Sequence, residues 1–187
     1  ILHVAQTHET VMKLLLAARE WDIDILFESR NEVAFDLTRP LRHPDARRQY
    51  EAFEERGYEM PEHLENPNFF CDKFVLWFEH PEQLAGFRTT SDRYFECIDR
   101  GGNFREFVPL GCSKATGLNY VLDYYRIDKK DAYAFGDSTN DLPMLKYAKT
   151  SIAMGNSNPL ILPYCTYQTT PIEEDGIANA LKHFHLI

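Results

Sequence analysis

Apolar side chains recur at helical spacing near the start of the chain, at Val11, Leu14, Leu15 and Ala18. This spacing places them on one face of a helix. Thr7 precedes the pattern and is a suitable N-cap, because a threonine hydroxyl can accept a hydrogen bond from the first turn. The pattern therefore predicts a helix that begins after Thr7 and ends near Glu20.

Two pairs of strand-like segments follow in the first half of the chain, and each pair is joined by a short polar turn. The predicted elements are strands 23–29 and 32–37, helix 44–58, strand 73–79, helix 81–88 and a hairpin over 93–110 that turns at Gly101-Gly102-Asn103. A helix followed by two strands occurs twice in this order. The order predicts a compact α+β domain over residues 1–109.

Beyond Leu110 the hydrophobic pattern changes, and short apolar runs alternate with helical patterns. The expected elements are helix 114–126, strand 132–136, helix 141–148, strand 150–154, a proline-rich loop, strand 164–168 and helix 176–184. Alternation of this kind predicts an α/β domain with a parallel sheet over residues 110–187. Such sheets bind ligands beyond the carboxyl ends of their strands.

Composition and charge narrow the class of protein. The 187 residues are 44% hydrophobic and 26% charged, which is typical of a chain that folds into a globule. A formal net charge of -9 argues against a nucleic acid as partner. We find no apolar run long enough to span a membrane and no signal sequence. Four cysteines without a C-x-x-C pair favour reduced thiols in the cytoplasm: Cys71, Cys97, Cys112 and Cys165.

The segment "AFGDSTNDLPML" brings two carboxylates to the end of a predicted strand. Residues 132–135 are apolar enough to be buried on both faces, and Gly136 allows the chain to turn. If Asn140 or Asp141 caps the next helix, Asp137 and Asp141 converge on one point of the loop. Paired carboxylates repel unless a proton or cation lies between them. Because oxygen ligands suit a hard cation, the pair predicts an Mg²⁺ site.

A purely structural interpretation of this segment also stays open. Ser138, Asn140 and Asp141 are residues that often form turns and caps, and Pro143 suits the first turn of a helix. This interpretation explains those residues without a metal. It does not explain why an aspartate stands at position 137.

A second candidate is the lysine in "PLGCSKATGL". The apolar pattern of helix 114–126 makes Ser113 its N-cap and puts Lys114 in the first turn. A cation there opposes the helix dipole by about 0.3–1 kcal/mol, so an anionic group is expected nearby. The alternative for Lys114 is an ordinary solvated side chain.

Four segments of the second half resemble the Cof-type phosphatases of the haloacid dehalogenase (HAD) superfamily: "SKATGL", "GDSTNDLPML", "IAMGN" and "EEDGIANAL". The resemblance implies the C-terminal part of a HAD-like Rossmannoid core, with residues 1–109 as an α+β cap that selects the substrate. It also implies a Mg²⁺-dependent phosphomonoester hydrolase acting on a small phosphorylated metabolite, such as a sugar phosphate or a phosphorylated cofactor.

The resemblance assigns roles by position. Lys114 corresponds to the lysine that holds the transferred phosphoryl group, and Asp137 to the acidic ligand of Mg²⁺. Asp141 corresponds to the second acidic residue supporting the metal, and Asn140 to a polar contact near the phosphate. Gly155-Asn156 either lines the entrance to the site or forms a simple turn.

One part of the family's pattern is missing. Its nucleophile is an aspartate in D-x-D-G-[ST], which forms an aspartyl-phosphate, and the only D-x-D here is Asp22-Ile23-Asp24, followed by Ile-Leu. We interpret this pair as structural. The sequence, which opens at Ile1 rather than at a methionine, is therefore expected to be a fragment that starts inside the cap, is inactive alone and exposes a strand edge.

Two other classes of protein are alternatives to the hydrolase. A non-catalytic HAD-fold remnant that binds or regulates would also lack the nucleophile. A phospho-acceptor receiver domain is disfavoured, because its lysine follows its aspartate whereas Lys114 precedes Asp137. The natural substrate and the oligomeric state stay open.

Overall fold

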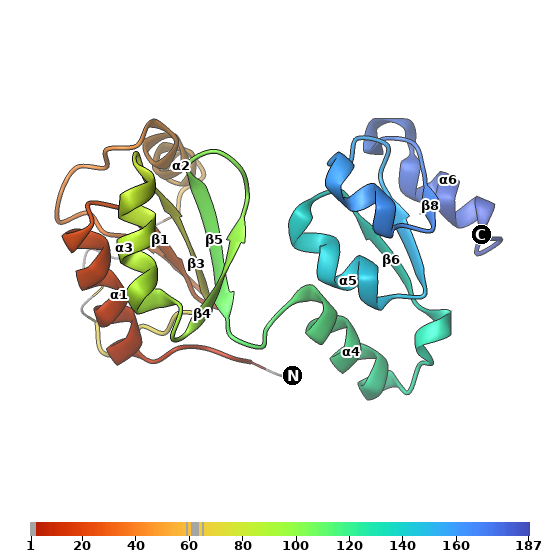
Figure 1. Cartoon of the computed structure of the whole chain (residues 1–187), viewed down its shortest axis with the longest axis horizontal. Helices are drawn as coiled ribbons and strands as arrows, with labels where there is room; N and C mark the ends of the chain where they lie inside the picture. The colour runs from red at the N-terminus through yellow and green to blue at the C-terminus, as the bar shows by residue number, and fades with distance from the viewer. Residues whose placement is uncertain (1–2, 59, 61–63, 65) are drawn as a thin grey trace. The chain divides into compact units, whose positions relative to one another are not determined.

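The computed structural model describes residues 3–58, 60, 64 and 66–187. The chain divides into two compact units, Ile1–Leu110 and Gly111–Ile187 (Figure 1). Each unit has its own sheet and its own buried apolar residues.

The first unit is built on a five-stranded antiparallel sheet in the order β2-β1-β3-β5-β4. Its elements are α1 His8–Glu20, β1 Asp24–Glu28, β2 Val33–Phe35, α2 Pro44–Glu55, β3 Lys73–Trp77, α3 Pro81–Ser91, β4 Phe95–Asp99 and β5 Phe104–Pro109. The helices and both hairpins predicted for this half of the chain are confirmed. α3 continues three residues beyond its predicted end, to Ser91.

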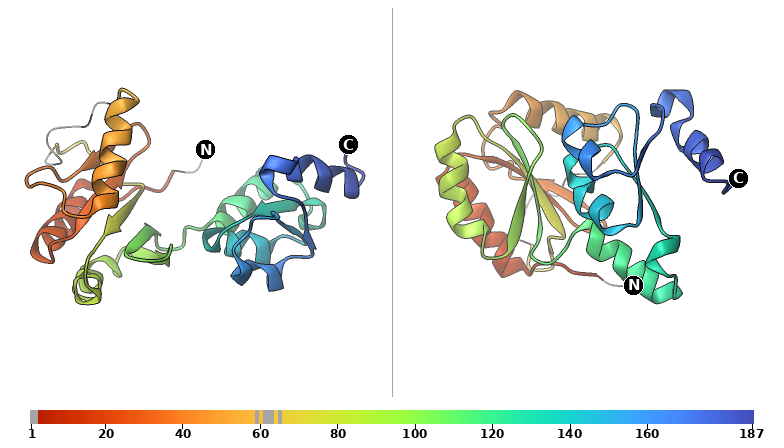
Figure 2. Two further views of the ribbon diagram at one scale, coloured as in Figure 1. Left: turned by 90° about the horizontal axis from the view of Figure 1, so that it is seen from above. Right: turned by 45° about the vertical axis from the view of Figure 1, so that its right-hand side comes forward.

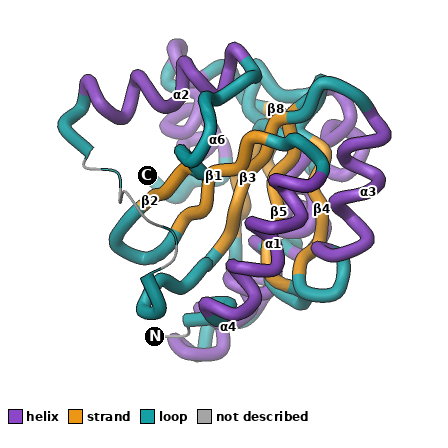
Figure 3. Tube along the Cα trace, turned by 90° about the vertical axis from the view of Figure 1, so that its left-hand side faces the viewer, coloured by secondary structure: helices purple, strands orange, loops and turns teal. Residues whose placement is uncertain are grey.

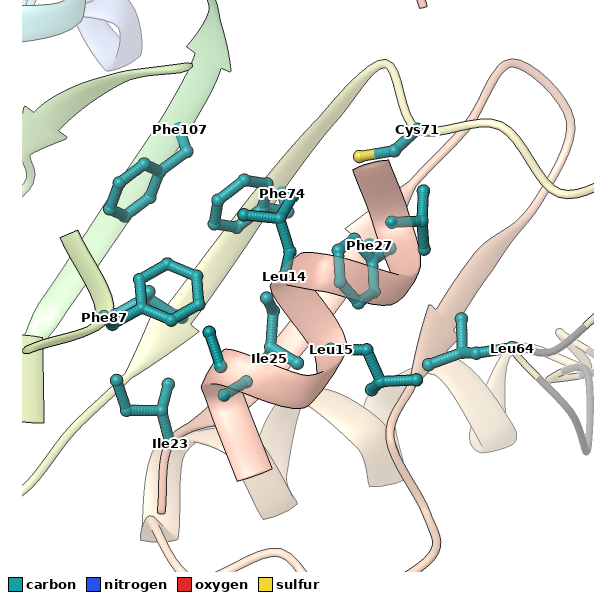
Figure 4. Packing of buried hydrophobic residues seen from close by; sticks show 14 of the residues in the cluster. Leu14, Leu15, Ile23, Ile25, Phe27, Leu64, Cys71, Phe74, Phe87 and Phe107 are labelled. Atoms are coloured by element: carbon teal, nitrogen blue, oxygen red, sulfur yellow. The ribbon is translucent and has the colours of Figure 1, made fainter. Parts of the chain in front are cut away.

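Helices cover both faces of this sheet. α1 and α3 lie side by side on one face, and α2 packs on the other (Figures 1 and 3). Phenylalanines and aliphatic residues of the strands point toward α1, and the ring of Phe74 stacks on that of Phe107 with centroids 4.6 Å apart (Figure 4). Phe27 and Phe87 also contact Phe74, so one phenylalanine on β3 joins the sheet to α3. Burial of these rings contributes to the stability of the unit.

Gly86 in α3 leaves room for the indole of Trp21, which follows α1. A Cβ atom at Gly86 would lie 2.1 Å from Cε2 of Trp21. We expect Gly86→Ala to destabilise the first unit by about 1–3 kcal/mol, because the ring has to move out of a packed site. Denaturant unfolding followed by tryptophan fluorescence measures this, since both tryptophans of the chain, Trp21 and Trp77, lie in this unit.

Gly117 in α4 is the matched control, because a Cβ atom there would meet nothing within 4 Å. Both glycines are inside helices, so Gly117→Ala removes backbone freedom without a clash. It should stabilise by about 0.5–1 kcal/mol, measured by circular dichroism. Equal effects of the two substitutions would contradict the role given to Trp21.

The second unit is a three-stranded parallel sheet in the order β6-β7-β8. Its elements are α4 Lys114–Tyr125, η1 Lys129–Asp131, β6 Tyr133–Gly136, η2 Thr139–Asp141, α5 Leu142–Tyr147, β7 Thr150–Ala153, η3 Pro159–Tyr164, β8 Tyr167–Gln168, η4 Ile172–Glu174 and α6 Gly176–His183. The α/β class and the parallel sheet are confirmed. Two details differ. The proline-rich loop contains the 3₁₀ helix η3, and β8 has only two residues, because the first residue of the predicted strand 164–168 still belongs to η3.

This sheet also lies between helices. Helices α5 and α6 flank the sheet (Figure 2). Ala134 of β6 packs in a cluster with Leu145 of α5, while Tyr133 on the opposite face contacts Phe184, which follows α6. The prediction that residues 132–135 are buried on both faces was wrong, because Tyr133 and Phe135 are only half-buried. β6 lies at one end of the strand order, which is consistent with the exposed strand edge expected from the sequence.

α4 is the most exposed helix of the second unit. Leu122 is its buried residue, whereas Tyr124 and Tyr125 are 69% and 66% exposed. None of the helices in the described ranges combines the length and the apolar character that a membrane span requires.

Candidate active site

The lysine of the candidate site is presented by the first turn of α4. Ser113 is the N-cap, as predicted: its Oγ accepts a hydrogen bond from the backbone N–H of Thr116 (3.1 Å), and Thr116 Oγ1 accepts one from the N–H of Ser113 (2.8 Å). This reciprocal pair fixes the start of the helix. The side chain of Lys114 is 48% exposed, and its ammonium donates to Oδ1 of Asp141. The anionic partner expected for this lysine is therefore present.

Asp141 organises the end of β6. Its carboxylate is almost fully buried, and while Oδ1 accepts from Lys114, Oδ2 accepts from the backbone N–H groups of Asp137 (3.0 Å) and Ser138 (3.2 Å). Asp141, one of the two candidates for the cap, is the N-cap residue of α5, and its side chain also takes part in the capping box of η2 with Ser138. Asp141 occupies the position before α5, but its side chain turns back toward β6 instead of binding the first turn of α5.

Burial raises the pKa of the Asp141 carboxyl, but the hydrogen bond from Lys114, those from the backbone of Asp137 and Ser138, and the lysine's charge outweigh it. The net effect lowers the pKa below its ordinary value, so the group is ionised at neutral pH. The carboxylate of Asp141 therefore places a negative charge beneath the loop that follows β6.

Gly136 is required for a reason other than turning. Its backbone is outside the left-handed region, and a Cβ atom there would lie 2.6 Å from Cβ of Asp141. The missing side chain lets Asp141 approach the strand closely enough to bind the two N–H groups.

Asp137 lies one residue beyond β6, and its side chain is exposed. Within the described ranges, no hydrogen bond or ion pair engages its carboxylate, and Asn140, half-buried in η2, likewise has no side-chain hydrogen bond. The structure thus brings Lys114, Asp137 and Asp141 to one loop, with Asn140 in the same turn. It also separates the two acids: Asp141 faces the lysine and the backbone, and Asp137 faces outward.

The residues present fit a hard divalent cation. Mg²⁺ takes one or two protein carboxylates and completes its octahedron with water and phosphate oxygens. Asp137 offers an exposed carboxylate, and the lone pairs of Asp141 not used by its hydrogen bonds could add a second, supporting oxygen. In the described ranges, three or more His, Cys, Asp or Glu side chains never gather into a metal cage. Carboxylate oxygens of this kind suit Mg²⁺.

Asp22 and Asp24, the only D-x-D pair of the sequence, are held in structural contacts. Asp24 is buried, and its Oδ2 accepts from the backbone N–H groups of Arg42 and His43, both at 2.7 Å. Asp22 pairs with the guanidinium groups of Arg39 and Arg42. The pair joins the end of α1 to β1, so the structural interpretation is confirmed.

Gly155-Asn156, for which two interpretations were open, follows β7. A Cβ atom at Gly155 would lie 2.5 Å from the backbone nitrogen of Pro171, so packing alone requires glycine there. Two residues that the sequence analysis did not single out follow this pair: Ser157 and Asn158 form hydrogen bonds to Gly136 and Asp137. A serine and an asparagine in a loop are too common to be recognised as site residues from sequence.

A lysine and two acids therefore lie beyond the carboxyl end of β6, where α/β proteins with parallel sheets bind their ligands. Residues 1–181 match the family described as haloacid dehalogenase-like hydrolase, and the chain belongs to that family. The resemblance of the second half to Cof-type members is confirmed.

Individual relatives agree with this assignment. The 5-amino-6-(5-phospho-D-ribitylamino)uracil phosphatase YitU of Bacillus subtilis (strain 168) is 39% identical over 79 residues, which is 42% of this chain and 29% of that protein. The HAD-superfamily phosphatase BT1666 of Bacteroides thetaiotaomicron has a TM-score of 0.80 at 27% identity, covering 98% of this chain and 67% of its own. The subclass IIB sugar phosphatase BT4131 shares the fold, with a TM-score of 0.77 at 21% identity, over 98% of this chain and 68% of its own. The aligned segment thus spans less than a third of YitU.

Proposed function

We propose that this chain carries the lysine and metal half of a Mg²⁺-dependent phosphomonoester hydrolase site. The observation that carries the proposal is the arrangement around Asp141, whose two oxygens tie the ammonium of Lys114 to the backbone of Asp137. Two groups 23 positions apart in sequence are thereby held at one strand end. A cation and an exposed carboxylate at that point are what phosphoryl transfer requires, since it depends on positioning and on neutralising negative charge.

Each residue has a role in this proposal. Lys114 has three N–H donors and gives one to Asp141, which leaves the others for phosphoryl oxygens. Asp141 keeps that ammonium in place and remains ionised. Asp137 binds the metal, with Asp141 in support, and Asn140 contacts the phosphate. Bound Mg²⁺ would withdraw charge from the phosphoryl oxygens.

The substrate is proposed to be a small phosphorylated metabolite, such as a sugar phosphate or a phosphorylated cofactor. YitU acts on a phosphorylated ribitylamino compound by its name, and it is 39% identical to this chain over 79 residues. The first unit, a separate α+β body, would be the cap that selects among substrates. Four free cysteines support a reducing, cytoplasmic location.

The nucleophile is proposed to lie outside residues 1–187, because in the one D-x-D pair Asp22 is paired with arginines and Asp24 is buried and accepts from two backbone N–H groups. The experiment compares two polypeptides with p-nitrophenyl phosphate: residues 1–187, and the same chain with the coding sequence upstream of Ile1. We expect Mg²⁺-dependent turnover by the longer polypeptide, loss of turnover with EDTA, and none by residues 1–187.

Other outcomes would change the proposal. Turnover by residues 1–187 alone would show that the nucleophile has been misplaced. Absence of the D-x-D-G-[ST] segment upstream, with Mg²⁺ bound and no turnover by either polypeptide, would favour the non-catalytic remnant that binds or regulates.

A further inference from the structure

The backbone of Asp137 is held on both sides by other parts of the second unit. Its N–H donates to Oδ2 of Asp141, at 3.0 Å, and its carbonyl oxygen accepts from the N–H of Asn158, at 2.8 Å. Both polar backbone atoms are therefore engaged, although the side chain has no partner in the described ranges. A residue held in this way presents its side chain in one direction, which lowers the cost of binding a ligand.

The carbonyl preceding Asp137 is held as well. The Gly136 oxygen accepts from the N–H of Met154 at 3.0 Å, which continues the parallel pairing of β6 and β7. It also accepts from Oγ of Ser157 at 3.2 Å. Ser157 is half-buried, so water competes less for this hydrogen bond than at an exposed position.

We infer that Ser157 is a positioning residue for the metal-binding carboxylate of Asp137. Its hydroxyl is the one side-chain donor in the described ranges that binds the strand end from the loop after β7. Together with the N–H of Asn158, it makes this loop a clamp on the peptide units on either side of the Asp137 Cα atom. Ser157 does not contact the metal in this role. The inference rests on the proposed Mg²⁺ site.

The clamp explains how two loops that follow different strands act as one site. The loop after β6 carries Asp137, and the loop after β7 carries Ser157 and Asn158. Without the hydroxyl, the Gly136–Asp137 peptide keeps its hydrogen bond from Met154 but loses the second. The peptide would then tilt more freely, and the Asp137 carboxylate would sample several directions.

The test measures Mg²⁺ binding by the full chain, from the NMR shifts of the Asp137 and Ser138 amides as MgCl₂ is added. We expect Ser157→Ala to weaken Mg²⁺ affinity about three- to tenfold, the range that loss of one hydrogen bond typically produces. Ser157→Thr keeps the hydroxyl and should restore affinity to within about twofold. If Ser157→Thr restores the affinity that Ser157→Ala loses, the hydrogen bond of the hydroxyl is responsible rather than the space that the side chain fills.

Ser151 supplies a matched control. Its Oγ donates to the carbonyl of Tyr164 at 3.0 Å, so Ser151→Ala also removes a bond from a hydroxyl to a carbonyl within the second unit. It lies on β7 and is paired with Ala134, away from the strand end. Ser151→Ala should lower the melting temperature while leaving Mg²⁺ affinity unchanged.

Two outcomes would overturn the inference: wild-type Mg²⁺ affinity in Ser157→Ala, or equal weakening by Ser151→Ala. If the wild-type chain itself binds no Mg²⁺, the metal assignment of the proposed function fails instead. Hydrogen exchange of the Asn158 amide then decides about the clamp. It should be faster in Ser157→Ala than in Ser151→Ala, and equal rates would refute the clamp.

Discussion

Asp137→Asn is expected to abolish Mg²⁺-dependent phosphatase activity of the polypeptide that includes the upstream coding sequence, by at least about a hundredfold. Asparagine has the same shape but is neutral, and a neutral amide is a poor ligand for Mg²⁺ in comparison with a carboxylate. The side chain of Asp137 is exposed, and the hydrogen bonds at this position use main-chain atoms. Stability should therefore change by no more than about 0.5 kcal/mol.

The measurements are the rate with p-nitrophenyl phosphate against MgCl₂ concentration and the denaturant midpoint. The matched control is Asp131→Asn, because Asp131 is also exposed and lies in the turn before β6, at the opposite end of the strand. This control should keep full activity. A Mg²⁺-dependent rate in Asp137→Asn close to that of the control would show that the metal is bound elsewhere.

The local structure of the first unit could be predicted well from sequence. Alternating apolar residues and the turn at Gly101-Gly102-Asn103 specify β4 and β5 through interactions between near neighbours. Helices α1 and α2 begin where the pattern predicted, because amphipathic spacing is a local property. Thr7 is the N-cap residue of α1, as predicted, but its hydroxyl accepts no hydrogen bond from the first turn. What joins these elements, such as the stacking of Phe74 on Phe107, depends on the order of strands in the sheet.

Burial in the second unit was harder to predict, because it depends on neighbours that are distant in sequence. The run from Ala132 to Phe135 is apolar throughout, which is typical of a central strand. β6 nevertheless lies at one end of the strand order, and alternate side chains along it stay half-buried. Composition alone does not reveal which side chains of a strand the neighbouring elements cover.

In the candidate site too, local properties could be predicted from sequence, whereas contacts between distant residues could not. The unfavourable place of Lys114 in the helix dipole predicted an anionic partner, and Asp141 is that partner. Sequence could not tell which acid would take this role, because the answer depends on how the turn after β6 rotates Asp137 outward. Ser157 could not be identified at all, since its hydrogen bond to Gly136 crosses between two loops.

Lys114→Met should lower both activity and stability, by separate routes. Removing the ammonium takes away the proposed phosphate ligand, so the rate should fall at least about a hundredfold. It also leaves the buried carboxylate of Asp141 without its cation, which costs about 1–3 kcal/mol, since the lysine is half exposed. In the wild type the lowered pKa of Asp141 adds stability that is present above the unfolded pKa of about 3.9 and lost as pH falls through the folded pKa. In Lys114→Met that pKa rises, so acid unfolding should begin at a higher pH.

The double variant Lys114→Met/Asp141→Asn separates the two routes. With the carboxylate replaced by an amide, no uncompensated charge is buried, so stability should recover in part and the acid sensitivity should disappear. Activity should stay lost, because the phosphate ligand is still absent. Lys146→Met is the control: its ammonium lies over the ring of Tyr164, at 4.1 Å, and its loss should leave the rate unchanged. If the double variant regained activity, the ammonium of Lys114 would serve only to neutralise Asp141, and its proposed contact with the phosphoryl group would have to be abandoned.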